Sequence, residues 1–397
     1  MAECPVVPAK TGAGRTFNLA LTVLLRTSDK LFSSINAQED EMKNQLASTV
    51  RKFFTQPLFA VAFSLLLATP SVVSAQKLIS PKAASNSGVQ AQPPYSVSVF
   101  AQSVPGVYTQ PDSIAPSSNA VFIGYGNGGA PNGSTAKPST IVQYDFNGNV
   151  HNQVFVNGHN DGLKINPTTG DLWALQNEDA NATLVIFDPQ TLTQKQKYFL
   201  GTGPHGGGYD DMVFLGGNIY FSASNPQNNP NNEPAIVQLT ANGGSFTLTP
   251  VLYGNASATD IPTGQGVVLN LQDPDSMTFN VGGDIVLDSQ ADGELVVVHN
   301  PGGGNQKVFR VLLTVGGQGT TVDDTLFLRS SSGVMLVADR DGETVYAITA
   351  PFLEPGSAYS ASDSGGFVGA LNFITGELTP VVTGMVSPHG MGFIPQQ

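Results

Sequence analysis

Cysteine is almost absent from this chain, and charged residues are scarce. Its 397 residues include one cysteine, Cys4, and only 12% of them are Asp, Glu, Lys or Arg. A single thiol near the N-terminus excludes a fold held together by disulfide bonds. Low charge disfavours a mainly helical protein, because helices draw heavily on Glu and Lys. The stability of the fold must therefore come from its hydrophobic core.

Positive charge is scarcer than negative charge. The chain has 17 Lys and Arg against 30 Asp and Glu, and seven of the basic but only five of the acidic residues precede Gln76. The remainder is strongly acidic, which repels nucleic acid and anionic lipid. An acidic surface also keeps secreted proteins soluble. We therefore expect no nucleic-acid partner.

Glycine and proline, by contrast, are abundant. The chain has 44 Gly and 27 Pro, together with many β-branched and aromatic residues. This composition is typical of short strands joined by tight turns. Pairs such as Asn147-Gly148 and Asp341-Gly342 supply the positive φ angles that tight hairpins require. We therefore predict an all-β protein.

A four-residue motif recurs six times along this β-rich chain. The copies are Pro111-Asp112-Ser113-Ile114, Asn160-Asp161-Gly162-Leu163, Tyr209-Asp210-Asp211-Met212, Pro274-Asp275-Ser276-Met277, Val322-Asp323-Asp324-Thr325 and Pro388-His389-Gly390-Met391. Successive Asp or His positions are 49, 49, 65, 48 and 66 residues apart. A period near 48 residues indicates a closed ring of four-stranded blades, a β-propeller.

The repeat predicts how each blade is built and how the ring closes. Each motif opens a first strand, and further strands follow, such as residues 334–338 and 343–347 after the Asp323 motif. The last motif needs partners, and the strand at residues 95–100 is the natural one, so that the two chain ends close the ring. This gives six blades, with five as the alternative. Two insertions, residues 255–270 and 351–366, are expected in loops, the second with a short helix at 357–362.

The N-terminal part has the pattern of a secretory signal. Lys43, Arg51 and Lys52 precede an apolar run at residues 57–68, and Val73-Ser74-Ala75 ends it with small residues. This predicts a signal peptide from Met42, cleaved after Ala75. The apolar run is short for a membrane span, although an uncleaved anchor is the alternative.

The remaining boundaries follow from that signal. We interpret residues 1–41 either as the result of an upstream start codon assigned in error or as a cytoplasmic extension. Residues 76–94 are expected to be a flexible leader, and residues 95–397 the propeller. The mature protein is predicted to be exported, to a periplasm or out of the cell, without a stable membrane span.

The motif residues are the candidate site. First strands of a propeller begin at one face around the axis, so we expect five Asp side chains to converge there. Like charges held close together require a cation or a proton, and carboxylate oxygens suit Ca²⁺ better than Zn²⁺. The alternative is that each Asp accepts backbone hydrogen bonds and holds a blade junction together. The candidate metal ligands are Asp112, Asp161, Asp210, Asp275 and Asp323.

Three histidines accompany these motifs. His159 stands two residues before Asp161, His205 stands five before Asp210, and His389 lies in the last motif. Neutral imidazole can bind a metal or transfer protons near neutral pH. We take His389 and His205 as candidate catalytic residues. The chain contains no G-x-S-x-G, Walker or H-E-x-x-H motif.

Short stretches resemble a known group of propellers. Residues 160–174 resemble the P-D-G-L-x-x-D-x-x-G-x-L-W-V-A signature of gluconolactonase and regucalcin-like lactonases. Pro388-His389-Gly390-Met391 and Pro274-Asp275-Ser276-Met277 look like the blade openings of NHL-repeat propellers. The resemblance implies a six-bladed propeller, and it implies that Asp161 helps to hold a divalent metal and takes part in catalysis.

Two functional hypotheses follow. The first is an exported, monomeric propeller that binds a small molecule, a glycan or a protein through its loops. The second is a metal-dependent hydrolase or lyase, similar to the lactonases, with its site at the mouth of the central channel.

Overall fold

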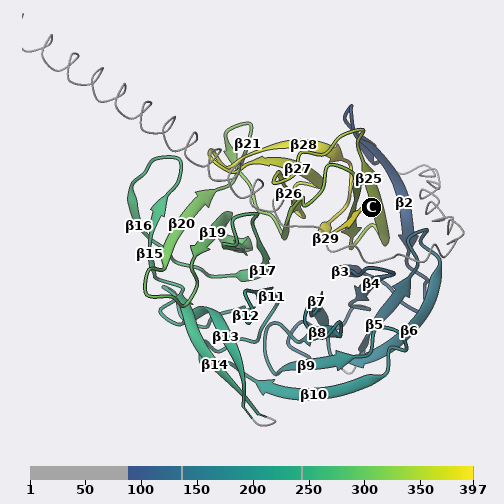
Figure 1. Ribbon diagram of the computed structural model, residues 1–397, viewed down its shortest axis with the longest axis horizontal. Coiled ribbons are helices and arrows are strands. Elements are labelled where there is room, and N and C mark those ends of the chain that lie inside the picture. Colours follow the sequence, from purple (N-terminus) through teal and green to yellow (C-terminus); the bar gives the residue numbers. More distant parts are fainter. Residues whose placement is uncertain (1–87, 136, 243–244, 397) are drawn as a thin grey trace, which may run out of the picture. The chain divides into compact units, whose positions relative to one another are not determined.

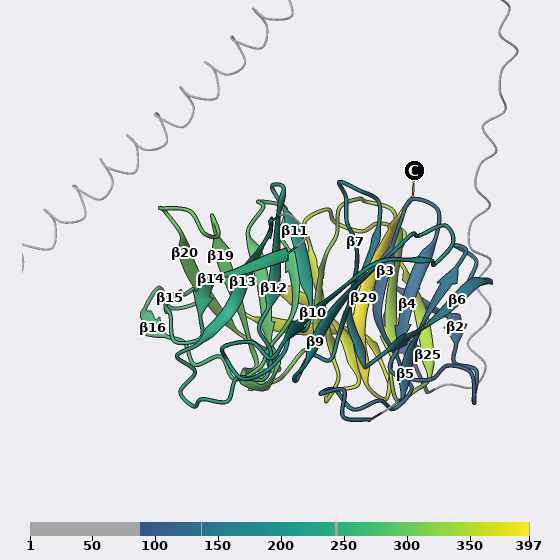
Figure 2. The same ribbon diagram turned by 90° about the horizontal axis from the view of Figure 1, so that it is seen from below.

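The structure, a computed structural model, describes residues 88–396 except 136 and 243–244. Strands dominate this part, and they surround a common centre (Figures 1 and 2). The described residues contain no helix that is long and apolar enough to cross a membrane. The predicted extension 1–41, the predicted signal peptide 42–75 and most of the predicted leader lie outside the described residues.

Four sheets are each built from consecutive strands in simple up-and-down order. The first has β3 (Pro111–Pro116), β4 (Val121–Tyr125), β5 (Pro138–Tyr144) and β6 (Val150–Asn157). The second has β7 (Asn160–Ile165), β8 (Leu172–Gln176), β9 (Ala182–Phe187) and β10 (Gln194–Gly201). The third has β11 (Met212–Leu215), β12 (Asn218–Ser222), β13 (Pro234–Asn242) and β14 (Ser245–Tyr253). The fourth has β17 (Pro274–Phe279), β18 (Ile285–Ser289), β19 (Glu294–His299) and β20 (Lys307–Leu312).

The last two sheets interleave in the chain. The fifth has β23 (Asp324–Phe327), β26 (Ala358–Ser362), β27 (Phe367–Asn372) and β28 (Glu377–Thr383). The sixth has β29 (Pro388–Pro395), β24 (Gly333–Asp339), β25 (Thr344–Thr349) and β2 (Ser96–Gln102). The hairpin β24–β25 thus leaves the sheet of β23 and joins the sheet that contains β2 and β29.

This interleaving corrects the predicted order of the strands. Residues 334–338 and 343–347 do not follow β23 in its sheet, because β24 pairs with β29 and β25 pairs with β2. The place beside β23 is taken by β26. The region 351–366, predicted as a loop with a short helix, therefore contains a buried strand. Alternating apolar residues identify a strand but not its neighbour, which is why the sequence misled here.

The strands β2 and β29, predicted to be partners that close the ring, share the sixth sheet but lie at its two edges. They do not pair with each other, because β25 and β24 stand between them. The six first strands also contact one another in a closed cycle, in the order β3, β7, β11, β17, β23, β29 and back to β3. The all-β propeller is confirmed. Each of the first five sheets takes its four main strands from the chain that begins at Pro111. The sixth sheet also contains β2, which precedes Pro111 in the sequence.

Short extra strands extend two sheets. The insertion 255–270 forms β15 (Ser257–Asp260) and β16 (Gly266–Val268), and β15 runs parallel to β20. The fifth sheet gains β1 (Gln90–Ala91), β21 (Thr314–Val315) and β22 (Gln318–Gly319), and β1 pairs with β28. Residues 90–91 were predicted within the flexible leader, so the ordered fold begins earlier than the sequence indicated.

The hydrophobic core consists of six clusters, each between two neighbouring sheets. One joins Val185 and Ala115 across the first and second sheets, and another joins Leu336 and Ile123 across the sixth and first. The second strands of the blades are buried on both faces, which explains their continuous apolar runs. Trp173 is buried and packs edge-on against Phe214. Burial of these faces holds the blades together and fixes where the first strands meet.

Candidate metal and active site

The motif residues meet at a small space on the axis. Its lining comes from all six first strands and the residues just before them: Asp112, Ser113, Ile114, Asp161, Gly162, Lys164, Asp210, Asp211, Ser276, Asp323, Asp324 and Gly390. The free volume for a water-sized sphere is about 10 Å³. That is close to the minimum needed by one water molecule or ion. A substrate would therefore have to sit above this space, at the mouth.

Local backbone irregularities aim the motif side chains at the axis. The ladder between β3 and β4 shifts register between Pro111 and Ile114, and that between β7 and β8 shifts between Asn160 and Leu163. Such bulges place an extra residue in one strand and turn its side chain. The first strands also approach very closely. A Cβ at Gly162 would lie 2.3 Å from the carbonyl oxygen of Asp210, so only glycine fits there.

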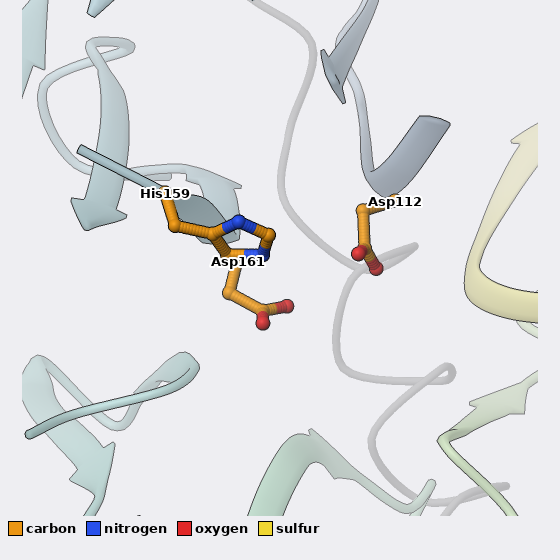
Figure 3. Close-up of side chains that lie close together, drawn as sticks. All are labelled: Asp112, His159 and Asp161. Atoms are coloured by element: carbon orange, nitrogen blue, oxygen red, sulfur yellow. The ribbon is translucent and has the colours of Figure 1, made fainter. Parts of the chain in front are cut away.

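Asp112, His159 and Asp161 form the group best suited to a metal ion (Figure 3). They come from two neighbouring blades, and one ligand atom from each lies within 4.8 Å of the others. Asp112 and His159 are buried, while Asp161 is partly exposed. Two carboxylates and an imidazole are a donor set that accepts several divalent ions.

Hydrogen bonding fixes the state of His159. Its Nδ1 lies 3.1 Å from the carbonyl oxygen of Gly129, which can only accept, so Nδ1 carries the proton. Burial lowers the pKa of His159 and keeps the ring neutral, against the opposing charge of Asp112. The Nε2 atom, 3.7 Å from Oε1 of Glu178, is left with a free lone pair. Neutral imidazole oriented by a carbonyl is the usual arrangement of a histidine that binds metal.

The other four blades contribute Asp210, Asp275, Asp323 and His389. The Nε2 atom of His389 is 3.5 Å from Oδ1 of Asp323, and its Nδ1 lies 2.9 Å from the carbonyl oxygen of Ser387. Oδ1 of Asp210 is buried without a hydrogen-bond partner. Of the predicted ring, Asp112, Asp161, Asp210 and Asp323 line the space on the axis. Asp275 and His389 do not line it but lie close to these acids.

Negative charge at this place greatly exceeds positive charge. Burial raises the pKa of Asp161 well above its ordinary value, and the nearby carboxylates of Asp210 and Asp112 raise it further. Burial likewise raises the pKa of Asp210, Asp275 and Asp323, and neighbouring carboxylates add to the effect. The one arginine of the group, Arg340, has its Nε atom 3.7 Å from Oδ2 of Asp112. Bound protons or a cation are needed to offset the rest.

A second set of acids, next to the ring in sequence, links the blades. Oδ2 of Asp211 accepts the backbone N–H of Met277 at 3.0 Å, and Oδ2 of Asp324 accepts that of Met391 at 2.7 Å. Each bond connects one first strand to the next one in the ring. The blade-junction role considered as the alternative for the motif acids therefore belongs to this second set.

His205 is placed differently from the other candidates. Its Nε2 lies 2.7 Å from the carbonyl oxygen of Gly208, and its ring packs edge-on against Tyr209. The side chain is 1% exposed, and burial lowers its pKa. These contacts make it a packing residue of the loop before β11, so the structure gives no support for a proton-transfer role.

Several site residues were not selected from the sequence. His159 stands just before β7 and two residues before Asp161, so its place beside a motif was a usable signal. Glu178 and Arg340 come from loops after second strands, at the face where the first strands begin. Lys164 follows Asp161 in β7 beyond the bulge. For these three, only the ring geometry brings them to the axis.

Among known proteins, the chain is similar only to solved structures. No family model matches the chain, and no curated protein matches it either. Solved structures similar to it include a periplasmic gluconolactonase from Pseudomonas aeruginosa, 12% identical with a TM-score of 0.42 over 72% of this chain and 89% of that one. Another is virginiamycin B lyase from Staphylococcus aureus, 10% identical with a TM-score of 0.45 over 76% and 96%. A streptogramin B lyase is 14% identical, with a TM-score of 0.40 over 72% of each chain.

These likenesses are with the fold. Gluconolactonase and lyase propellers are thus among the solved structures similar to this chain. At such identities no residue role follows from them.

Proposed function

We propose that this propeller is a divalent-cation-dependent hydrolase or lyase that acts on a small polar substrate at the channel mouth. The proposal depends on the group formed by Asp112, His159 and Asp161, whose ligand atoms lie within 4.8 Å of one another. Next to this group, buried carboxylates outnumber basic groups. The donor set fits a divalent ion, because the imidazole is neutral and the carboxylates lack enough basic partners.

The three ligands would each contribute one atom to the ion. A bound divalent ion would polarise a carbonyl or phosphoryl oxygen and lower the pKa of a coordinated water. Asp112 is held by Arg340 on its outer side. His159 is held by the carbonyl of Gly129. These contacts orient the ligands without occupying the face that they share.

Glu178 is placed to move a proton at the mouth. Its Oε1 atom is 3.7 Å from Nε2 of His159, and its Oε2 atom is buried without a hydrogen-bond partner. Burial raises the pKa of Glu178 well above its ordinary value, and the charges of Asp161 and Asp210 raise it further. A carboxyl group shifted in this direction can give up or accept a proton closer to neutral pH.

His389 offers the second proton-transfer group. Its Nδ1 is bonded to the carbonyl of Ser387, so Nε2 faces Oδ1 of Asp323 as an acceptor. Gln290 also donates to that Asp323 oxygen, at 3.2 Å. A proton held between His389 and Asp323 would stay beside the ring.

The decisive test is metal binding, measured by calorimetry and by elemental analysis after dialysis with and without chelator. The protein comprising residues 76–397 should bind one divalent ion and should lose thermal stability on chelation. Chelated and reloaded protein should then be assayed with lactones and esters. Absence of Ca²⁺, Mn²⁺ and Zn²⁺ binding at millimolar concentration would overturn the proposal.

A binding propeller without catalysis is the second candidate, favoured by one feature of the mouth. Amide side chains crowd the loop after β12, where Asn228 donates to Asn232 and Asn270 donates to Asn229. Gln272 joins them through Asn270. Such amides suit the hydroxyl groups of a glycan. Binding of a glycan array that survives chelation, without any turnover of lactones or esters, would favour this candidate.

Export is a separate proposal that rests on the sequence. The charged, apolar and small-residue order ending at Ala75 supports cleavage there. N-terminal sequencing of the protein recovered outside the cytoplasm should begin at Gln76. Recovery of a chain that still carries Met1 would contradict it.

A further inference from the structure

Lys164 places an ammonium group inside the acidic channel. It lies on β7, three residues after Asp161, and the bulge at the motif lets both side chains reach the same space. Its Nζ atom is 2.9 Å from Oδ2 of Asp211. Within residues 88–396, no other lysine lines this space.

The surroundings keep this amine charged. Burial acts to lower the pKa of Lys164, but the carboxylates of Asp211 and Asp324 outweigh it and raise the pKa above its ordinary value. The side chain is 29% exposed, so its stem is only partly covered. The ammonium is therefore a permanent positive charge at the axis near neutral pH.

The carboxylate that Lys164 contacts has unused capacity. Oδ2 of Asp211 accepts both the ammonium and the N–H of Met277, while Oδ1 of Asp211 is buried without a hydrogen-bond partner. Asp211 is 4% exposed. A buried carboxylate oxygen without a partner is costly unless a cation is close by. Without Lys164, Asp211 would be a strong cation ligand.

Room on the axis is limited. The same space of about 10 Å³ is lined by the ring acids Asp112 and Asp161 and by Lys164 with Asp211. The free volume is about that needed by one water molecule, so the channel has room for one free ion beside the lysine. One narrow space thus contains two positions for a cation, and the ammonium group of Lys164 occupies one of them.

We propose that Lys164 is a built-in cation that takes up the position beside Asp211 and so limits the acidic channel to a single exchangeable divalent ion. The proposal rests on the proposed function only for the ion on the Asp112 side. It assigns Lys164 a positioning role, since its charge holds the second acid set together and keeps further ions out.

The test compares ion stoichiometry in wild type and Lys164→Met, which keeps an unbranched side chain one atom shorter and removes the charge. Ca²⁺ and Mn²⁺, each alone, are titrated by calorimetry and checked by equilibrium dialysis. We expect one more bound ion in Lys164→Met than in wild type. The metal-free variant should melt roughly 5–10 °C lower than wild type, and millimolar Ca²⁺ should restore more of that loss than it adds to wild type. Lys195→Met, which removes an exposed lysine paired with Asp171 and Asp188, is the matched control and should change neither result.

Each outcome decides between the two proposals. One ion in wild type and two in the variant support both. No ion in wild type and one in the variant support the role of Lys164 and overturn the proposed function. A folded variant that gains no ion overturns the role of Lys164, whatever wild type binds.

A second variant tests the proposal if Lys164→Met does not fold. Lys164→Met combined with Asp211→Asn removes both charges and keeps an oxygen that can accept the Met277 N–H. This double variant should fold and bind the same number of ions as wild type. An additional ion in the double variant would show that Asp211 is not its ligand and would overturn the proposal.

Discussion

The Oδ2 atom of Asp324 accepts a hydrogen bond of 2.7 Å from the backbone N–H of Met391. This bond joins β23 and β29, the first strands of the fifth and sixth sheets. These two sheets are interleaved in the chain, because the hairpin β24–β25 follows β23 but belongs to the sixth sheet. Both groups are buried. A buried N–H without an acceptor is costly, so this contact contributes to closing the ring.

Replacing Asp324 tests that contribution. Asp324→Asn keeps an oxygen that can accept the Met391 N–H, whereas Asp324→Ala removes it. We expect Asp324→Ala to be less stable than Asp324→Asn by about 1–3 kcal/mol, measured by urea unfolding. The same pair of substitutions at the exposed residue Asp341 should differ little. Equal stability of the two Asp324 variants would show that this bond has no net effect.

The two buried histidines next to the motifs should differ in metal binding. His159→Gln removes a proposed ligand, and His205→Gln removes a packing residue of the loop before β11. We expect His159→Gln to weaken divalent-ion binding by at least about tenfold, while His205→Gln lowers the melting temperature and leaves affinity unchanged. Calorimetric titration with Ca²⁺ and Mn²⁺ measures both. The reverse ranking would remove His159 from the site.

Metal-free protein should lose stability as the pH rises. Burial raises the pKa of Asp324 and of Asp273 to about 6, and it raises that of Asp288 further above the ordinary value. Acids with raised pKa bind more protons in the folded state, so their stabilising effect is present below pH 4 and is lost as pH rises through 6. In chelator, the free energy of unfolding should therefore be higher at pH 5 than at pH 8.

Asp288→Asn identifies one source of that pH dependence. The amide keeps an oxygen for the 2.9 Å hydrogen bond from Oγ1 of Thr325 and removes the ionisation. We expect a smaller fall in stability between pH 5 and pH 8 than in wild type. Asp188→Asn is the control, because hydrogen bonds lower the pKa of Asp188 and it is already ionised at pH 5. An unchanged slope in Asp288→Asn would contradict the assignment.

Gly162→Ala tests the close approach of neighbouring first strands. The added Cβ would lie 2.3 Å from the carbonyl oxygen of Asp210 and 2.9 Å from the Cα atom of Asp211. Backbone atoms cannot give way easily, so we expect a loss of roughly 1–3 kcal/mol or more in urea unfolding, with weaker ion binding. Gly304→Ala, where the space is open, should be neutral. A stable Gly162→Ala variant with normal ion binding would show that the strands can separate without harm.

Much of this fold could be predicted because short local patterns in the sequence indicate its strands. The motif that contains Asp161 returns in similar form five more times, and short apolar runs follow each copy. The sequence did not identify the strands that pair with the hairpin β24–β25. Residues 333–349 have the same alternating pattern whether they lie beside β23 or beside β29, and only the need to fill the sheet between β2 and β29 decides.

The site shows the same division. Sequence determined which residues open the first strands, because a repeated Asp at a fixed place in a repeated unit must recur at an equivalent place in the ring. Tertiary structure alone decided that Glu178, Arg340 and Lys164 join them and that His205 does not. The reason is physical: periodicity is a property of the backbone and can be read along the chain, whereas side-chain contacts between blades depend on bulges and loop paths that leave no period in the sequence.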